Sequence, residues 1–150
     1  MKIEEAIKQN RFDSSHQKAI INIIYTANWI RDRQCELFVK HELLPQHYNI
    51  LRILKGKHPG PSSPGQIKEV MLDKSNDITR LIDKLVKKGL AKRNLCETNR
   101  RKIDVFITVK GLSLLKEINE PFKKHISALK KIISVKEAEN LSELLDKFRL

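Results

Sequence analysis

The chain has 150 residues, enough for one compact domain with a few added helices and too few for several large domains. Apolar residues make up 40% and charged residues 32%, a balance that supports a packed core and excludes wholesale disorder. The formal charge is +12, and residues 55–110 hold fourteen lysines and arginines against six acids, so the middle of the chain is expected to bind a polyanion such as nucleic acid.

Several kinds of protein are disfavoured. No stretch approaches the roughly 20 apolar residues of a membrane span, and charges interrupt residues 1–12 where a signal peptide needs apolar residues, so we expect a cytoplasmic protein with no membrane partner. Cys35 and Cys96 lack C-x-x-C spacing, which disfavours a zinc site. The histidines form no H-E-x-x-H pattern, and residues 56–65 lack the Gly-Lys-Ser/Thr ending of a phosphate loop. We therefore expect no enzyme activity, metal or cofactor.

The first half of the chain is predicted to be helical. The serines at 14–15 can cap a long helix, whose apolar residues recur at helical spacing with no Gly or Pro before Pro45. Pro45 suits the first position of a second helix, which Gly56 closes. One of the serines at 62–63 can then cap a short third helix after a loop rich in Pro and Gly.

The pattern then changes from helix to strand. A fourth helix after residues 73–76 is expected to run to Lys88 and end at Gly89. Residues 90–95 and 102–108 alternate in polarity, which indicates two paired strands joined by a basic tip.

The C-terminal part is predicted to be helical again. One apolar pattern begins after Gly111 and continues past Pro121, a residue that should kink or interrupt the helix. A last helix is expected over residues 135–148, with Ser134 as its cap. The fold class is therefore mainly α with a small β-hairpin.

A helix, a turn, a helix and a basic hairpin form a winged helix-turn-helix, whose second helix enters a DNA major groove while the hairpin reaches the flanking backbone or minor groove. Arg80 lies on the outward face of that helix, where its guanidinium suits guanine and where Asp83 can orient it through an i, i+3 pair. A solvated helix face is the alternative interpretation. The residues expected to contact DNA are Ser75, Asn76, Thr79, Arg80, Lys84, Lys87, Arg100, Arg101 and Lys102.

Four segments resemble the multiple-antibiotic-resistance regulator (MarR) family of bacterial transcription factors. They are Leu-Pro-Gln at 44–46, Ile-Thr-Arg-Leu-Ile-Asp-Lys-Leu at 78–85, Lys-Gly-Leu-Ala-Lys-Arg at 88–93 and Ile-Thr-Val-Lys-Gly at 107–111. The resemblance implies a winged helix-turn-helix core over residues 44–110, with dimerisation arms at 1–43 and 111–150. One departure is Asn99, which stands at the hairpin tip where the family usually has an acid that pairs with an arginine.

The resemblance implies a homodimer that binds a pseudo-palindrome in double-stranded DNA, usually as a repressor whose affinity for DNA a small ligand or an oxidant controls. Aromatic candidates for the effector site are Tyr25, Trp29, His47 and Tyr48, with core packing as the simpler role of each. A redox-sensing regulator that uses Cys96 or Cys35 is one alternative. A winged-helix protein-interaction module without specific DNA binding is another.

Overall fold

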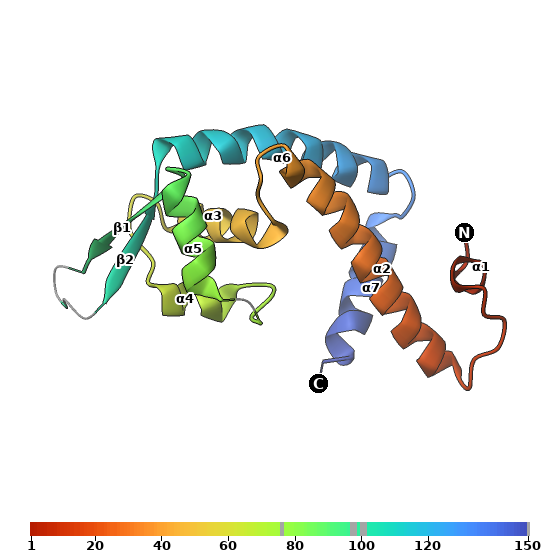
Figure 1. Ribbon diagram of the computed structural model, residues 1–150. Coiled ribbons are helices and arrows are strands. Elements are labelled where there is room, and N and C mark those ends of the chain that lie inside the picture. Colours follow the sequence, from red (N-terminus) through yellow and green to blue (C-terminus); the bar gives the residue numbers. More distant parts are fainter. Residues whose placement is uncertain (76, 97–98, 100–101, 150) are drawn as a thin grey trace. The chain divides into compact units, whose positions relative to one another are not determined.

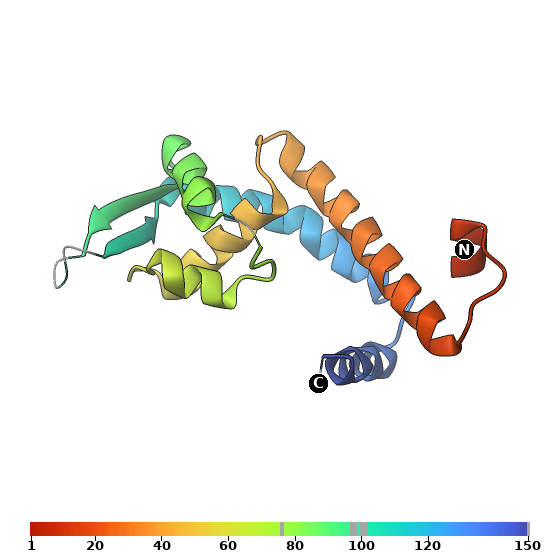
Figure 2. The same cartoon turned by 60° about the horizontal axis from the view of Figure 1, so that its bottom comes forward.

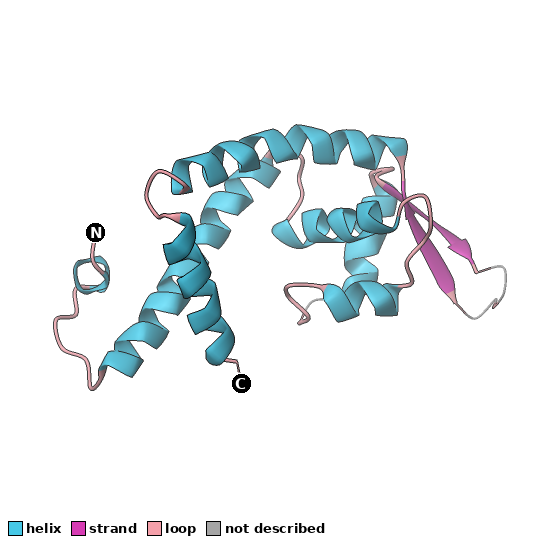
Figure 3. Cartoon of the chain, turned by 180° about the vertical axis from the view of Figure 1, so that it is seen from behind, coloured by secondary structure: helices cyan, strands magenta, loops and turns pink. Residues whose placement is uncertain are grey.

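The structure is a computed structural model that describes residues 1–75, 77–96, 99 and 102–149. These residues form two compact units, Met1–Pro45 and Gln46–Leu150. Over these described residues the fold is mainly helical with one antiparallel pair of strands, as the sequence predicts (Figure 3). None of the helices in the described ranges is long and apolar enough to cross a membrane.

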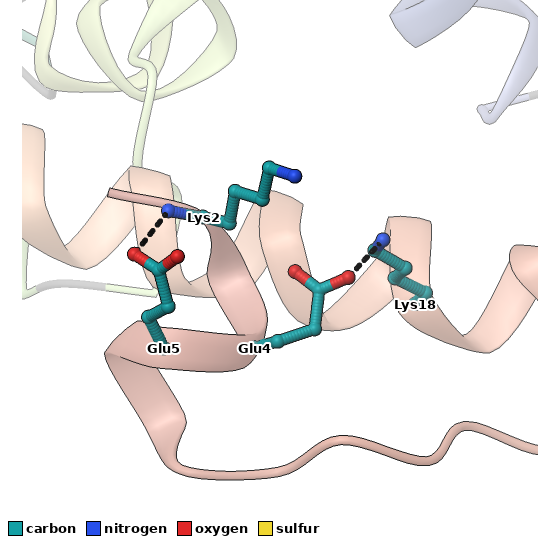
Figure 4. Close-up of polar contacts among 4 residues, drawn as sticks. All are labelled: Lys2, Glu4, Glu5 and Lys18. Carbon is teal, nitrogen blue, oxygen red and sulfur yellow. Dashed lines mark hydrogen bonds and ion pairs between the residues drawn. The ribbon is translucent and has the colours of Figure 1, made fainter.

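The first unit is built on the long helix α2 (Ser15–Val39). Ser14 caps it, since the hydroxyl accepts a hydrogen bond from the backbone N–H of Gln17 at 3.1 Å. A short helix that the sequence analysis did not predict, α1 (Ile3–Ile7), precedes it and buries Ile3. Glu4 pairs with Lys18 of α2 (Figure 4), and this hydrogen bond lowers the pKa of the Glu4 carboxyl.

The second unit begins with three helices, α3 (Pro45–Lys57), α4 (Pro64–Val70) and α5 (Ile78–Lys87). Of the two candidate caps for α4, Ser63 is the one used, because its hydroxyl accepts the backbone N–H of Gln66 at 3.3 Å. Ser62 is buried and instead pairs with Val105 of the hairpin through two backbone hydrogen bonds of 3.0 Å. This bridge ties the loop before α4 to the hairpin.

The hairpin consists of β1 (Ala91–Leu95) and β2 (Ile103–Ile107), within one residue of the expected ranges. Ala91 lies opposite Ile107, and both are buried where the strands meet the helices. Gly89 has φ +70°, a conformation that glycine adopts without strain, and so turns the chain from α5 into β1. In both Figures 1 and 2 the hairpin extends away from α3, α4 and α5.

The chain ends in α6 (Val109–Leu129) and α7 (Val135–Lys147). The sequence predicts that Pro121 kinks or interrupts the first of these helices, and the interruption is wrong, because α6 runs without a break through Pro121. Proline removes a single N–H donor, and Tyr48 holds the surrounding turn by stacking on Phe122 at 5.0 Å between ring centroids and by donating to Asn119 Oδ1 at 2.7 Å.

The core of the second unit lies where α3, α4, α5, the base of the hairpin and the first half of α6 face one another. Its buried apolar residues are Tyr48, Ile50, Leu51, Leu54, Ile67, Met71, Ile78, Leu81, Ile82, Leu85, Leu90, Ala91, Val105, Ile107, Leu115 and Ile118. The second half of α6 and α7 contribute no residue to this list. The core therefore fixes the helices and the hairpin of the winged segment with respect to one another.

Candidate DNA interface

Helix α5 has one buried face and one exposed polar face. Ile78, Leu81, Ile82 and Leu85 are buried, as the helical spacing predicts. Thr79, Arg80, Lys84 and Lys87, all expected to contact DNA, lie exposed on the other side. The side chain of Arg80 is 87% accessible to solvent, so it is available to an external partner.

The N-terminal end of α5 is organised by Asp77. Its carboxylate accepts hydrogen bonds from the backbone N–H groups of Thr79 at 3.0 Å and Arg80 at 3.3 Å, which caps the helix. The same carboxylate lies 3.4 Å from Nε of Arg80. Because the ion pair is exposed, it stabilises the fold little and leaves the guanidinium able to turn toward another acceptor.

The expected Asp83–Arg80 pair is not formed. Asp83 instead forms an ion pair with Arg93 of β1, a residue that the sequence analysis did not select. The pairing occurs because Gly89 turns the chain so that β1 contacts α5 before the hairpin extends away, a tertiary contact that i, i+3 spacing cannot reveal. The contact joins the exposed face of α5 to the hairpin and compensates the negative charge of Asp83 on that face.

The hairpin adds further positive charge beside α5. Lys92 lies opposite Phe106 in the strand register, with its ammonium 5.3 Å from the ring centroid. Lys102 is exposed and closes the described part of the tip, where its carbonyl accepts the backbone N–H of Cys96 at 3.0 Å. Asn76, Arg100 and Arg101, three of the predicted DNA contacts, lie outside the described residues. Their roles stay predictions.

Ser75, the remaining predicted contact, is exposed in the turn that precedes α5. Its hydroxyl donates to Asp73 Oδ1 at 2.5 Å, and its backbone N–H donates to the same oxygen at 3.1 Å. Ser75 therefore shapes the turn, whether or not it also touches DNA.

A groove of about 790 Å³ lies between α3 and α6, and no residue of α5 lines it. Tyr48 and Phe122 form an aromatic wall, and apolar residues such as Leu115 and Ile126 also line the groove. Four cationic side chains complete the lining: Arg52, Lys55, Lys123 and Lys130. Lys123 also bonds Glu120 at 2.7 Å, a hydrogen bond that lowers the pKa of the Glu120 carboxyl. Aromatic surface and positive charge therefore meet in one groove.

The four aromatic effector candidates are not brought together within one unit. Tyr48 lines the groove, whereas His47 is 2% exposed and is not part of its lining. Tyr25 and Trp29 belong to α2 in the other unit, where the Arg33 guanidinium lies 4.2 Å from the Trp29 ring centroid. Of the two cysteines, Cys35 is half-buried in α2 and Cys96 is half-buried directly after β1. The redox alternative stays a prediction.

The helix-turn-helix with its exposed polar second helix, followed by a two-stranded hairpin, defines a winged-helix protein. No protein-family model matches the chain. The chain is 32% identical over 121 residues to the HTH-type transcriptional regulator MhqR of Bacillus subtilis, and the matched part covers 81% of this chain and 82% of that protein.

The fold is also found in solved structures. The crystal structure of a MarR transcription factor from Planctomyces limnophilus is 34% identical, with 91% of this chain and 98% of that chain covered and a TM-score of 0.69. A mutant MarR from E. coli complexed with operator DNA has a TM-score of 0.70 at 23% identity, covering 85% of this chain and 91% of that one. The chain belongs to the MarR family of winged-helix transcriptional regulators, a family of regulators and not of enzymes.

Proposed function

We propose that this protein is a homodimeric repressor that binds a pseudo-palindromic DNA operator in the bacterial cytoplasm and responds to a small ligand. The observation that carries the proposal is the exposed stripe of Thr79, Arg80, Lys84 and Lys87 on α5, which lies beside a basic hairpin. A helix of this kind enters the major groove, where base edges present distinct donors and acceptors. The E. coli MarR of similar fold was crystallised with operator DNA, which supports this assignment.

The base contacts are assigned to Arg80 in the N-terminal half of α5 and to Asn76, which precedes the helix in the sequence. Arg80 can donate two parallel hydrogen bonds to O6 and N7 of a guanine, and Asn76 suits an adenine. Lys84, Lys87 and the hairpin residues Arg100, Arg101 and Lys102 are assigned to phosphate or minor-groove contacts, with Ser75 and Thr79 beside them. The lysines and the hairpin arginines would then supply affinity for any DNA. Arg80 and Asn76 would supply the discrimination between sequences.

Dimerisation is proposed from apolar surface that the described residues of one chain leave uncovered. Helix α7 buries none of its residues. Its apolar Leu141 and Leu144, together with Phe148 directly after it, each keep at least half of their surface exposed. In the other unit, Ile20 and Ile24 of α2 are similarly exposed. Apolar stripes of this size on helices mark protein interfaces, and a second copy of the chain would cover them with two-fold symmetry. Residues 1–43 and 111–150 are thus proposed as dimerisation arms around the winged segment 44–110.

A ligand site is proposed in the groove between α3 and α6. Its cations favour an anionic group and the Tyr48 ring favours a flat apolar body, so a small planar acid fits this chemistry. Calorimetric titration with benzoate tests the site. We expect binding to the wild-type protein and at least a tenfold loss with Arg52→Ala, whereas equal binding to both would exclude the groove.

The experiment that tests the main proposal is selection of bound duplexes from a pool of random DNA. We expect enrichment of one sequence with two inverted half-sites, because each protomer of a two-fold dimer presents one α5. Recovery of unrelated sequences, together with a stable dimer, would favour the protein-interaction module instead.

A further inference from the structure

The turn between α4 and α5 determines where the DNA-facing helix begins, and α3 holds this turn by side-chain hydrogen bonds. Asn49 lies on α3, and its Oδ1 accepts the backbone N–H of Leu72 at 3.0 Å. Leu72 is 92% exposed, so no packing of its side chain fixes this part of the turn. The hydrogen bond to Asn49 is therefore a specific constraint on the backbone here.

A second connection runs through Asp73. Gln46, one turn before Asn49 on the same face of α3, donates from Nε2 to Asp73 Oδ2 at 3.3 Å. The other oxygen, Asp73 Oδ1, accepts from the backbone N–H and the hydroxyl of Ser75. The chain Gln46–Asp73–Ser75 thus reaches to within two residues of Asp77, which caps α5.

Helix α3 is a firm base for these contacts. Ile50, Leu51 and Leu54 are fully buried, which fixes the helix in the core, while Asn49 and Gln46 are half-buried at its margin. Rotamers locked against a packed helix can hold a neighbouring segment to within a fraction of an ångström. Hydrogen bonds between side chain and backbone need that precision, since they weaken steeply with angle.

We propose that Asn49 and Gln46 are positioning residues for sequence recognition: they hold residues 72–75 against α3 and so set the place at which α5 meets the bases. The inference rests on the proposed function. Two bidentate hydrogen bonds to a base require the guanidinium of Arg80 in one orientation, whereas attraction to phosphates tolerates displacement. Loss of the anchors should therefore reduce discrimination between sequences more than affinity for DNA in general.

The test compares the full-length wild-type protein with Asn49→Ala, Asn49→Asp and Gln46→Ala. Asn49→Asp keeps an acceptor oxygen for the Leu72 N–H, so it is the conservative variant. Ser63→Ala is a matched control, because it also removes a side-chain oxygen that accepts a backbone N–H, but at the start of α4 and outside the proposed dimerisation arms. The readouts are the ratio of the Kd for random duplex to the Kd for the selected operator, and the hydrogen-exchange protection of the Leu72 amide. The ratio cancels the effect of the added charge of Asp on DNA attraction.

We expect the ratio to fall roughly three- to tenfold per half-site in Asn49→Ala, the worth of one net hydrogen bond, and less in Gln46→Ala. Asn49→Asp should keep the ratio within about twofold of wild type. The Leu72 amide should lose protection in Asn49→Ala and keep it in Asn49→Asp. An unchanged ratio in Asn49→Ala, or an equal fall in Ser63→Ala, would overturn the proposal. A wild-type protein that prefers no sequence would refute the proposed function instead, and an unprotected Leu72 amide in the wild type would refute the anchor.

Discussion

Replacing Gly111 by alanine should destabilise the protein, although alanine normally favours a helix. Gly111 is the third residue of α6, where the helix crosses the chain that links α5 to β1. A Cβ here would overlap the carbonyl oxygen of Leu90 and lie 2.8 Å from Cγ1 of Ile107. The Leu90 oxygen is backbone and accepts the N–H of Thr108 at 3.1 Å, so it cannot move aside without breaking this hydrogen bond.

The expected magnitude follows from two opposing effects. Overpacking costs about 1–3 kcal/mol, and contact with backbone places Gly111→Ala near the upper end. The helix preference of alanine over glycine offsets about 1 kcal/mol of this. The net loss of about 2 kcal/mol in the free energy of unfolding corresponds to a Tm lower by about 4–8 °C for a chain of this length.

Urea unfolding and a thermal scan at one fixed protein concentration measure this loss, since the proposed dimerisation would make Tm depend on concentration. Gly56→Ala is the matched control: it lies in α3, and its Cβ would meet nothing within 4 Å. We expect it to gain up to about 1 kcal/mol of stability from helix preference alone. A urea midpoint of unfolding for Gly111→Ala at or above that of the wild type would refute the reasoning from the contact between Gly111 and the Leu90 carbonyl oxygen.

The remaining predictions concern two ion pairs and one apolar residue. Arg93→Ala should cost at most about 1 kcal/mol of stability, because its pair with Asp83 is exposed. It should nevertheless weaken operator binding in an anisotropy titration. Unchanged binding would mean that the ion pair between the hairpin and α5 plays no part in binding DNA. The pair between Glu4 and Lys18 lowers the pKa of the Glu4 carboxyl below its ordinary value of 4.5. The pair therefore stabilises the docking of α1 on α2 above pH 4.5, and this contribution is lost as the pH falls through the lowered pKa. The hydrogen-exchange protection of α1 should therefore drop on acidification in the wild type and vary less in Glu4→Gln. The same pH dependence in both proteins would mean that the pair between Glu4 and Lys18 does not hold α1. Leu144→Glu should sediment as a monomer, and a persistent dimer would place α7 outside the interface.

Local patterns explain what could be predicted from the sequence. Burial of Ile78, Leu81, Ile82 and Leu85 follows from a period of 3.6 residues, which depends only on neighbours along the chain. Caps such as Ser14 follow from chemistry within three residues. The hairpin ranges likewise follow from alternation of polar and apolar residues. Short stretches of sequence therefore suffice to predict the helices and strands of the winged segment.

Contacts between distant segments could not be predicted in this way. The partner of Asp83 is Arg93, and the partner of the Leu72 N–H is Asn49, 23 positions earlier. Neither pair is spaced by a helical or strand repeat, so no local pattern in the sequence predicts the contact. Each contact forms only once the helices have packed. The five-residue helix α1 was missed for a related reason: it is too short for a periodic pattern, and its burial of Ile3 is tertiary.

The central claim, that α5 reads base pairs, is tested most directly through Arg80. Operator duplexes that differ by single base pairs are titrated with wild-type protein, Arg80→Ala and Arg80→Lys. Arg80→Ala should cost about 1–3 kcal/mol per half-site on the operator and much less on random DNA, with the preference flattened at one base pair in each half-site. Arg80→Lys should recover affinity but little discrimination, because an ammonium cannot form the two-pronged contact with guanine. Equal losses on every duplex would make Arg80 a phosphate contact, and no loss on any of them would contradict the claim.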